Sequence, residues 1–482
     1  MTKVDEARRR WLALFVLCGG SLMVVLDTTI VNVALPSISA DLGFSQSSLA
    51  WVVNAYLLTF GGFLLLGGRL GDLFGHRRLF LAGILLFTFA SVACGLAQSQ
   101  AVLVAARAVQ GLGGAVASAV SLSLMMVLFT EPAERAKAMG VFGFVASGGG
   151  SIGVLLGGVL TDTLDWHWIF LVNLPIGVAV LLLSRRLLPA AAPAGSDSGL
   201  DVAGAVTVTA ALMLAVYAIV NGNDVGWVSA RTISLLAVAA ALFGLFVAIE
   251  ARAPFPLVPL GLFRLRTLAT ANVIGVLWAA AMFAWFFLSA LYLQRVLGYS
   301  PLKVGLAFLP ANLIMGAFSL GLSARLVLRF GIRAPLAIGL VLAAMGLVTF
   351  ALAPVPGQCV LDVLPGMMLL GLGAGIAFNP VLLAAMSDVD PSEAGLASGI
   401  VNTAFMMGGA LGLAILASLA AARTDASSAG SGSLTALDEG YHAAFVVGAL
   451  FALTAAALAR ALLPAAAREP VASLEPAGRV MD

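Results

Sequence analysis

The fold is decided by the stretch Gly67-Gly68-Arg69-Leu70-Gly71-Asp72-Leu73-Phe74-Gly75-His76-Arg77-Arg78, which joins two long apolar runs at 51–66 and 79–97. A bilayer is crossed by about 20 apolar residues, so the link between the runs is a tight turn at a membrane surface. Its basic side chains favour the cytoplasmic side. Its glycines allow backbone angles that other residues resist. We expect a conformational latch here, formed by Asp72, Gly68, Gly75, Arg77 and Arg78.

A second copy of this loop occurs far downstream. Arg69-Leu70-x-x-x-Phe74-Gly75-x-Arg77 recurs as Arg325-Leu326-x-x-x-Phe330-Gly331-x-Arg333, and Leu42-Gly43-Phe44-Ser45 recurs as Leu297-Gly298-Tyr299-Ser300. The offsets are 256 and 255, so one register holds with a single gap. The alternative is coincidence between Gly-rich loops. Two matching membrane halves are typical of transporters whose halves rock about a site between them.

Asp72 has no counterpart in the second copy, where Leu328 stands at the matching position. The simplest alternative for Asp72 is a helix cap, or a carboxylate that neutralises the neighbouring arginines. An acid confined to one half favours a specific latch over either of these roles.

The composition excludes a soluble protein. The chain has 482 residues, of which 61% are hydrophobic and 10% charged, with a mean hydropathy of +1.07. Fourteen apolar runs can be counted, which predicts an all-α polytopic membrane protein with 14 transmembrane helices. The tenth run covers 304–326 and the thirteenth 397–421, and we expect an outer loop at 424–440. Of the 25 Lys and Arg residues, 20 fall on one side of these runs and 4 on the other. By the positive-inside rule both termini are cytoplasmic, with the protein in the cytoplasmic (inner) membrane.

The runs divide into a 6+2+6 arrangement. We expect an N-terminal six-helix bundle at 1–188 and a C-terminal one at 268–463. Residues 189–267 hold a flexible linker, two inserted helices outside the repeat register and a cytoplasmic surface loop. Residues 464–482 form a cytoplasmic tail.

Two ionisable side chains lie well inside the predicted spans. Asp27 is 15 residues past Leu12, which places it about 22 Å from the cytoplasmic edge, and Arg107 enters its helix from the other side to a similar depth. A charge at this depth is costly and indicates function by default. A change in their separation or hydration would couple proton binding to conformation. The alternative is a static buried pair that fixes helix packing.

Other polar, aromatic and glycine positions in the spans are open to two interpretations. Gly149, Gly153, Gly157 and Gly158 crowd the fifth span, where they serve close packing, bending or both. Uncharged polar side chains at membrane depth are either interhelical contacts or substrate contacts. The aromatic stripe of the ninth span faces lipid, packs against neighbouring helices, or lines a cavity that suits a bulky apolar or cationic substrate. These substrate-cavity candidates are Asn32, Asn54, Gln110, Trp285, Phe286, Asn312, Asn379 and Asn402.

The sequence shows no soluble-enzyme chemistry. His76, His167 and His442 are far apart, and no nucleotide loop, zinc spacing or nucleophile elbow is present. We therefore expect no enzymatic activity, no catalytic residue, no metal, no cofactor and no nucleic-acid partner. The expected partners are protons, a small-molecule substrate and the lipid bilayer, and we expect a monomer driven by a proton gradient.

Over nearly its full length the chain resembles the major facilitator superfamily, and within it the fourteen-helix drug:H+ antiporters of bacteria. The resemblance rests on Gly68–Arg78, on Leu26–Pro36, on Arg107-Ala108-Val109-Gln110-Gly111, on Gly149–Gly158 and on Asn173-Leu174-Pro175-Ile176-Gly177. Val154 stands where proline is usual in the antiporter glycine motif. The resemblance implies the major facilitator fold and a role for the fourth-helix Arg107 in proton coupling.

The same resemblance bears on the substrate. Relatives with broad cation specificity carry additional acids in the C-terminal bundle, and the tenth and thirteenth predicted spans have none. This favours export of a lipophilic neutral or monocationic compound, such as an antibiotic, by alternating access. The remaining alternatives are a proton-linked uptake symporter, a non-transporting sensor on the same fold, and a polytopic membrane enzyme.

Overall fold

Every regular element in the computed structural model is a helix, over the described residues 3–189, 200–318, 322–354, 357–390, 393–428 and 433–464. Within these residues, thirteen helices are long and apolar enough to cross a membrane, and Pro301–Ala317 is a shorter apolar helix. The predicted all-α membrane architecture is confirmed, while the exact number of fourteen spans stays a prediction.

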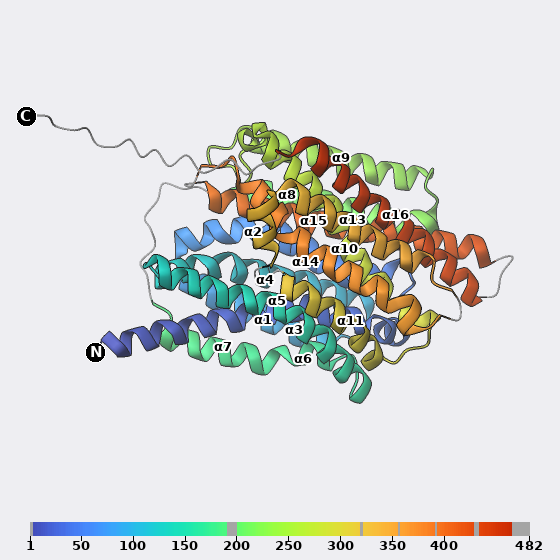
Figure 1. Cartoon of the computed structure of the whole chain (residues 1–482), viewed down its shortest axis with the longest axis horizontal. Helices are drawn as coiled ribbons and strands as arrows, with labels where there is room; N and C mark the ends of the chain where they lie inside the picture. Colours follow the sequence, from blue (N-terminus) through green and yellow to red (C-terminus); the bar gives the residue numbers. More distant parts are fainter. Residues whose placement is uncertain are drawn as a thin grey trace, which may run out of the picture.

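The helices run along one axis of the molecule (Figure 1). The first half contains α1 (Lys3–Leu42), α2 (Trp51–Phe74), α3 (His76–Gly95), α4 (Gln100–Leu128), α5 (Pro132–Thr163), α6 (Trp168–Leu171) and α7 (Asn173–Leu187). The second half contains α10 (Arg266–Leu291), α11 (Pro301–Ala317), α12 (Ser323–Phe330), α13 (Arg333–Ala351), α14 (Leu364–Met386), α15 (Ala394–Ser428) and α16 (Ser433–Leu462). A π-helical turn, Tyr292–Val296, continues α10.

The predicted internal repeat has a direct structural signature. The backbone φ angle is positive at five described glycines, and four of these are the repeat glycines. Gly43 (+71°) matches Gly298 (+67°), and Gly75 (+91°) matches Gly331 (+74°). Only glycine adopts such angles at little cost, so each copy needs its glycine to turn the chain between two helices. The two halves thus turn in the same way at matching positions.

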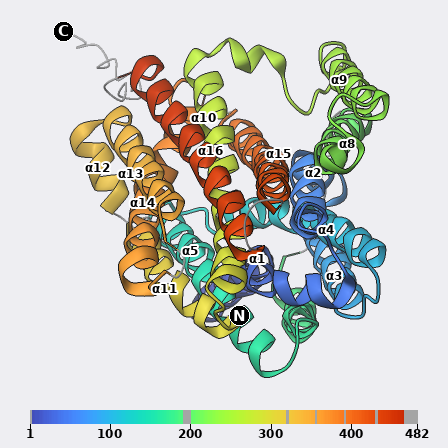
Figure 2. The ribbon, with the colours of Figure 1, turned by 90° about the vertical axis from the view of Figure 1, so that its right-hand side faces the viewer.

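The two halves meet along two seams. α5 packs against α11 at one seam, and α2 packs against α15 at the other. Figure 2 looks along the bundle and shows α2 beside α15. Both seams pair one helix from each half, which is the arrangement that a site between rocking halves requires.

The middle pair, α8 (Val202–Val225) and α9 (Ala230–Glu250), lies at the edge of the bundle (Figure 2). α8 contacts both α2 and α15, and α9 packs on α8. In α9 only 17% of the most apolar window is buried, against 78% in the span that contains α2. An apolar helix with so little protein cover faces lipid, so α9 is peripheral.

Four segments differ from their sequence-based assignment or lie wholly or partly outside the described residues. The tenth span, expected at 304–326, is α11 followed by α12, and residues 319–321 lie outside the described residues. Most of 424–440, expected as an outer loop, is helical, because α15 continues to Ser428 and α16 begins at Ser433. The linker at 190–199 and the tail at 465–482 also lie outside the described residues.

Candidate functional site: a buried ion pair and its network

Arg107 of α4 is held by three acceptors in the protein interior. Its Nε donates to the Val52 carbonyl oxygen at 2.8 Å, and its Nη1 donates to Gln110 Oε1 at 2.7 Å. Nη1 also donates to the Asp27 carboxylate. The guanidinium carbon lies 4.5 Å from the centre of the Tyr56 ring. A planar cation with donors on several edges suits this site, since it binds acceptors in its plane and stacks on an aromatic face.

Asp27 of α1 accepts two further hydrogen bonds, both from amides. Gln110 Nε2 lies 2.7 Å from Asp27 Oδ1, and Asn173 Nδ2 lies 3.4 Å from the same atom. The two amides also share Ser91 Oγ, at 3.1 Å from Gln110 and 3.0 Å from Asn173. The network therefore joins α1, α3, α4 and α7 around one carboxylate.

The chemistry of this network follows from its burial. Asp27, Arg107, Gln110 and Ser91 have no exposed surface, and Asn173 is 1% exposed. An unpaired charge here would cost several kcal/mol, so the two charges stabilise each other. Protonation of Asp27 would remove the negative partner while Arg107 kept its Val52 and Gln110 acceptors. Binding of one proton to Asp27 can therefore change the contacts that α1 makes with α4 and α7.

The motif glycines line one face of α5. A Cβ added at Gly149 would lie 3.0 Å from the Val25 side chain, and one at Gly157 would lie 2.6 Å from the Ile30 carbonyl oxygen. Gly153 faces Leu26 and Thr29 of the same helix α1. These three glycines let α5 approach the helix that carries Asp27. Gly158 instead meets the other half, with its Cβ position 2.7 Å from the Pro301 carbonyl oxygen.

The polar cavity candidates do not form one cluster with Asp27. Gln110 belongs to the Asp27 network. Asn32 and Asn402 bond back to carbonyl groups of their own helices. Asn54 is fully buried, and neither of its amide atoms has a partner among the described residues. Asn312 is 2% exposed and its Nδ2 is likewise unpartnered there, whereas Asn379 is half-buried and has a partner.

The aromatic candidates lie in a buried stack in the second half. Phe286 stacks on Phe308 with ring centres 5.4 Å apart, and Trp285 lies 5.9 Å from Phe308. Phe308 is one turn before Asn312 on α11. The indole nitrogen of Trp285 is buried and has no partner within the described part of the chain. Trp285 and Asn312 therefore offer donors beside an apolar stack, and their role in a cavity stays a prediction.

The predicted latch residues make different contacts from one another. Asp72 Oδ1 lies 3.2 Å from His76 Nε2. Arg77 Nη2 donates to the Arg185 carbonyl oxygen of α7 at 2.5 Å. Arg78 is exposed, and a Cβ added at Gly68 would meet nothing within 4 Å. The loop thus ties α2, α3 and α7 of the first half together, and its latch role stays a prediction.

Two side chains of the second half cross to α1 at the predicted outer side. Gln294 Nε2 donates to the Val33 carbonyl oxygen at 2.8 Å, and Arg295 Nη2 donates to Ser39 Oγ at 2.8 Å. Both donors come from the π-helical turn Tyr292–Val296, a type of turn that is frequent at functional sites. These bonds hold the two halves together two to three turns beyond Asp27.

Sequence reasoning missed several members of the Asp27 network. Asn173 was part of a quoted motif but had no assigned role, and Ser91, Tyr56 and the Val52 carbonyl carried no signal. Depth along a helix can be counted from the sequence, but the direction in which an uncharged side chain points cannot. Of this network, the charged residues Asp27 and Arg107 were the clearest signal in the sequence, because a charge is costly at membrane depth.

Comparison with known proteins gives a consistent result. Residues 17–413 match the family model described as Major Facilitator Superfamily. The chain is 40% identical over 452 residues to the puromycin resistance protein pur8 of Streptomyces alboniger, which covers 92% of this chain and 89% of that protein. It is 40% identical over 460 residues to the cephamycin export protein CmcT of Amycolatopsis lactamdurans, covering 95% and 93%.

A structural comparison agrees in fold. The xylose transporter XylE from E. coli superposes with a TM-score of 0.60 at 16% identity, covering 92% of this chain and 97% of that chain. The repeat glycines, the two seams between the halves and the sequence matches lead to one conclusion: the chain belongs to the Major Facilitator Superfamily.

Proposed function

We propose that this protein is a proton-coupled efflux transporter that exports a lipophilic neutral or monocationic compound, such as an antibiotic, by alternating access. The observation that carries the proposal is the fully buried Asp27–Arg107 pair in a chain of this superfamily. Its relatives include proteins named for puromycin resistance and cephamycin export. Transport breaks no bond in the substrate, so the protein is not an enzyme.

Asp27 loads the proton and Arg107 sets its affinity for that proton. With Asp27 charged, the pair and the two amides hold α1 against α4 and α7. With Asp27 neutral, the carboxyl group loses its attraction to Arg107, and α1 is freer to tilt with the motion of the halves. The gradient then biases the two conformations, and no cofactor takes part.

The positive-inside bias supports a cytoplasmic-membrane location with both termini in the cytoplasm. Proton entry from outside then matches the depth of Asp27, which by helix rise from Leu12 lies about 8 Å below the outer edge of a hydrocarbon core of about 30 Å. The second half supports the substrate class, because α11 has no acid and the one acid of α15, Asp425, lies in its last turn. A dication would lack a second carboxylate there.

The experiment is transport in inverted vesicles with an imposed proton gradient. Addition of a substrate such as puromycin should dissipate the gradient, and an uncoupler should stop substrate accumulation. Accumulation in right-side-out vesicles under an inward gradient would instead indicate the uptake symporter. Binding without flux in either orientation would indicate the sensor. A preference for dications over monocations would contradict the proposed substrate class.

A further inference from the structure

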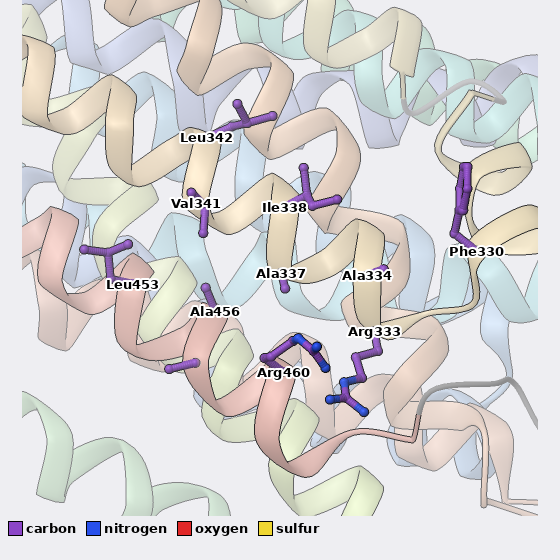
Figure 3. Close-up of a pocket in the computed structure, with 11 residues that line it drawn as sticks. Phe330, Arg333, Ala334, Ala337, Ile338, Val341, Leu342, Leu453, Ala456 and Arg460 are labelled. Atoms are coloured by element: carbon purple, nitrogen blue, oxygen red, sulfur yellow. The ribbon is translucent and has the colours of Figure 1, made fainter.

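An apolar groove of about 770 Å³ lies between α13 and α16, away from Asp27 and from both seams between the halves. Figure 3 shows its lining: Phe330, Arg333, Ala337, Leu342, Leu453 and Arg460 mark its outline. Ile338 and Leu453 are 56% and 43% exposed. A groove of this kind on a membrane protein is open to lipid rather than to water.

Two arginines close one end of the groove. Arg333 begins α13 and Arg460 lies in the last turn of α16. Their side chains point toward each other in Figure 3. In the part of the chain that the structure describes, neither guanidinium has an ion pair, and Arg333 Nε is buried without a partner. Arg329 adds a third cation, 5.2 Å from the ring of Phe330 at the same end.

The groove has the length of one leaflet. From Arg333 to Leu342 along α13 is nine residues, or about 14 Å at 1.5 Å per residue. Half of a hydrocarbon core of about 30 Å is about 15 Å. The arginines lie at the end that the positive-inside rule places in the cytoplasm. The groove therefore runs from the cytoplasmic headgroup level to the middle of the bilayer.

The first half shows what the matching arginine does when its charge is satisfied by protein. Arg77, the repeat counterpart of Arg333, donates to the Arg185 carbonyl oxygen at the end of α7. There the guanidinium bridges the two helix ends. In the second half Arg333 and Arg460 face each other across the end of the groove (Figure 3), and two like charges on either side of one site attract an anion.

We propose that this groove binds one anionic phospholipid of the cytoplasmic leaflet, with an acyl chain along Ala337 and Leu342 and the phosphate between Arg333 and Arg460. Basic pockets between helices on the cytoplasmic side recognise such headgroups, while the apolar walls accept the chain. None of the described residues that line the groove is a carboxylate, so a zwitterionic lipid finds no partner among them for its cationic group.

The test uses the full-length purified protein in detergent, titrated with phosphatidylglycerol or phosphatidylcholine of the same chains. Native mass spectrometry measures the bound lipid. Wild type should bind phosphatidylglycerol more tightly. Arg333→Gln with Arg460→Gln should weaken that binding about thirtyfold, from about 1 kcal/mol per basic residue. Ala337→Trp fills the groove with both arginines kept, and it should abolish binding of either lipid there.

The matched control is Arg264→Gln with Arg266→Gln. These two arginines are exposed on the same predicted side and lie outside the groove, so the double change should leave the phosphatidylglycerol affinity within twofold of wild type. Equal loss in the control, or full affinity in Arg333→Gln/Arg460→Gln, would overturn the proposal.

A second measurement uses the wild type alone, so its outcome does not depend on whether the variants fold. Cryo-electron microscopy of the wild type in phosphatidylglycerol nanodiscs should show one lipid with its phosphate between the two arginines. An empty groove, a helix of a second copy, or residues that follow position 464 in its place would each overturn the assignment.

Discussion

Arg107 of α4 donates to the carboxylate of Asp27 on α1 where both side chains are shielded from solvent, 80 residues apart in the sequence. Among the ion pairs of the described residues, it is the only one in which both side chains are fully buried. It therefore concentrates the electrostatic cost of burial at one place that a single proton can change.

Replacement of Asp27 by Asn should abolish substrate-driven proton movement in inverted vesicles while the protein still folds. The amide is isosteric and keeps an acceptor for Gln110, but it cannot take up a proton. The matched control is Asp41→Asn on the same helix, whose carboxylate accepts from Trp166 Nε1 at 3.0 Å. Coupling that survives in Asp27→Asn, measured with a pH-sensitive dye, would remove Asp27 from the mechanism.

Arg107→Lys should keep the positive charge but lose the planar arrangement of hydrogen-bond donors. An ammonium group cannot reach Val52, Gln110 and Asp27 together or stack on Tyr56 in the same way. Loss of one charged hydrogen bond is worth about 1.5–3 kcal/mol, so proton-coupled transport should fall about tenfold or more. Arg264→Lys, at an exposed position, is the control. Wild-type rates in Arg107→Lys vesicles would show that charge alone is sufficient.

Gly157→Val should destabilise the packing of α5 on α1, because its Cβ position is 2.6 Å from the Ile30 carbonyl oxygen. Forcing extra volume into such a contact costs about 1–3 kcal/mol. Gly148→Val on the same helix is the control, since its Cβ position meets nothing within 4 Å. Thermal unfolding of the detergent-solubilised proteins should rank Gly157→Val below Gly148→Val, and the reverse order would contradict close packing as the reason for Gly157.

Arg295→Ala should loosen the outer side by removing the bond to Ser39. In a protein without its native cysteines, a cysteine at the buried Val33 should then react several-fold faster with an impermeant maleimide added outside. Ser39→Ala should have the same effect, and the double variant should react no faster than either single one. Lys303→Ala, an exposed cation at the same predicted side, is the control. Independent, additive effects would show that the two residues do not act as a pair.

The sequence was sufficient for the parts of the structure that depend on length, charge and glycine. The apolar runs predicted the helices, the repeated words predicted the matching turns at Gly75 and Gly331, and counting along the helices placed Asp27 and Arg107 at one depth. Helix ends were underestimated, as at α15, because a helix continues with polar residues beyond the apolar core.

The sequence could not predict the direction in which the uncharged side chains point. Gln110 was grouped with cavity residues, yet it faces Asp27, and Asn173 lies 82 residues from its partner Ser91. An uncharged polar residue carries little penalty at membrane depth, so composition does not reveal which neighbour it meets. The sequence left open whether Trp285 and Phe286 face lipid, pack between helices or line a cavity, because their stack on Phe308 depends on how α10 and α11 cross.

The helix pair α8–α9 has a mechanical consequence. Asn223 of α8 donates to the Ser418 carbonyl oxygen of α15 at 2.7 Å, while Gly62 of α2 presents a bare backbone to Thr209 of α8. α8 is therefore hydrogen-bonded to α15 on one side, whereas on the other side it packs on a glycine of α2. We therefore expect α8 to move with the second half and to slide over α2 when the two halves move relative to each other.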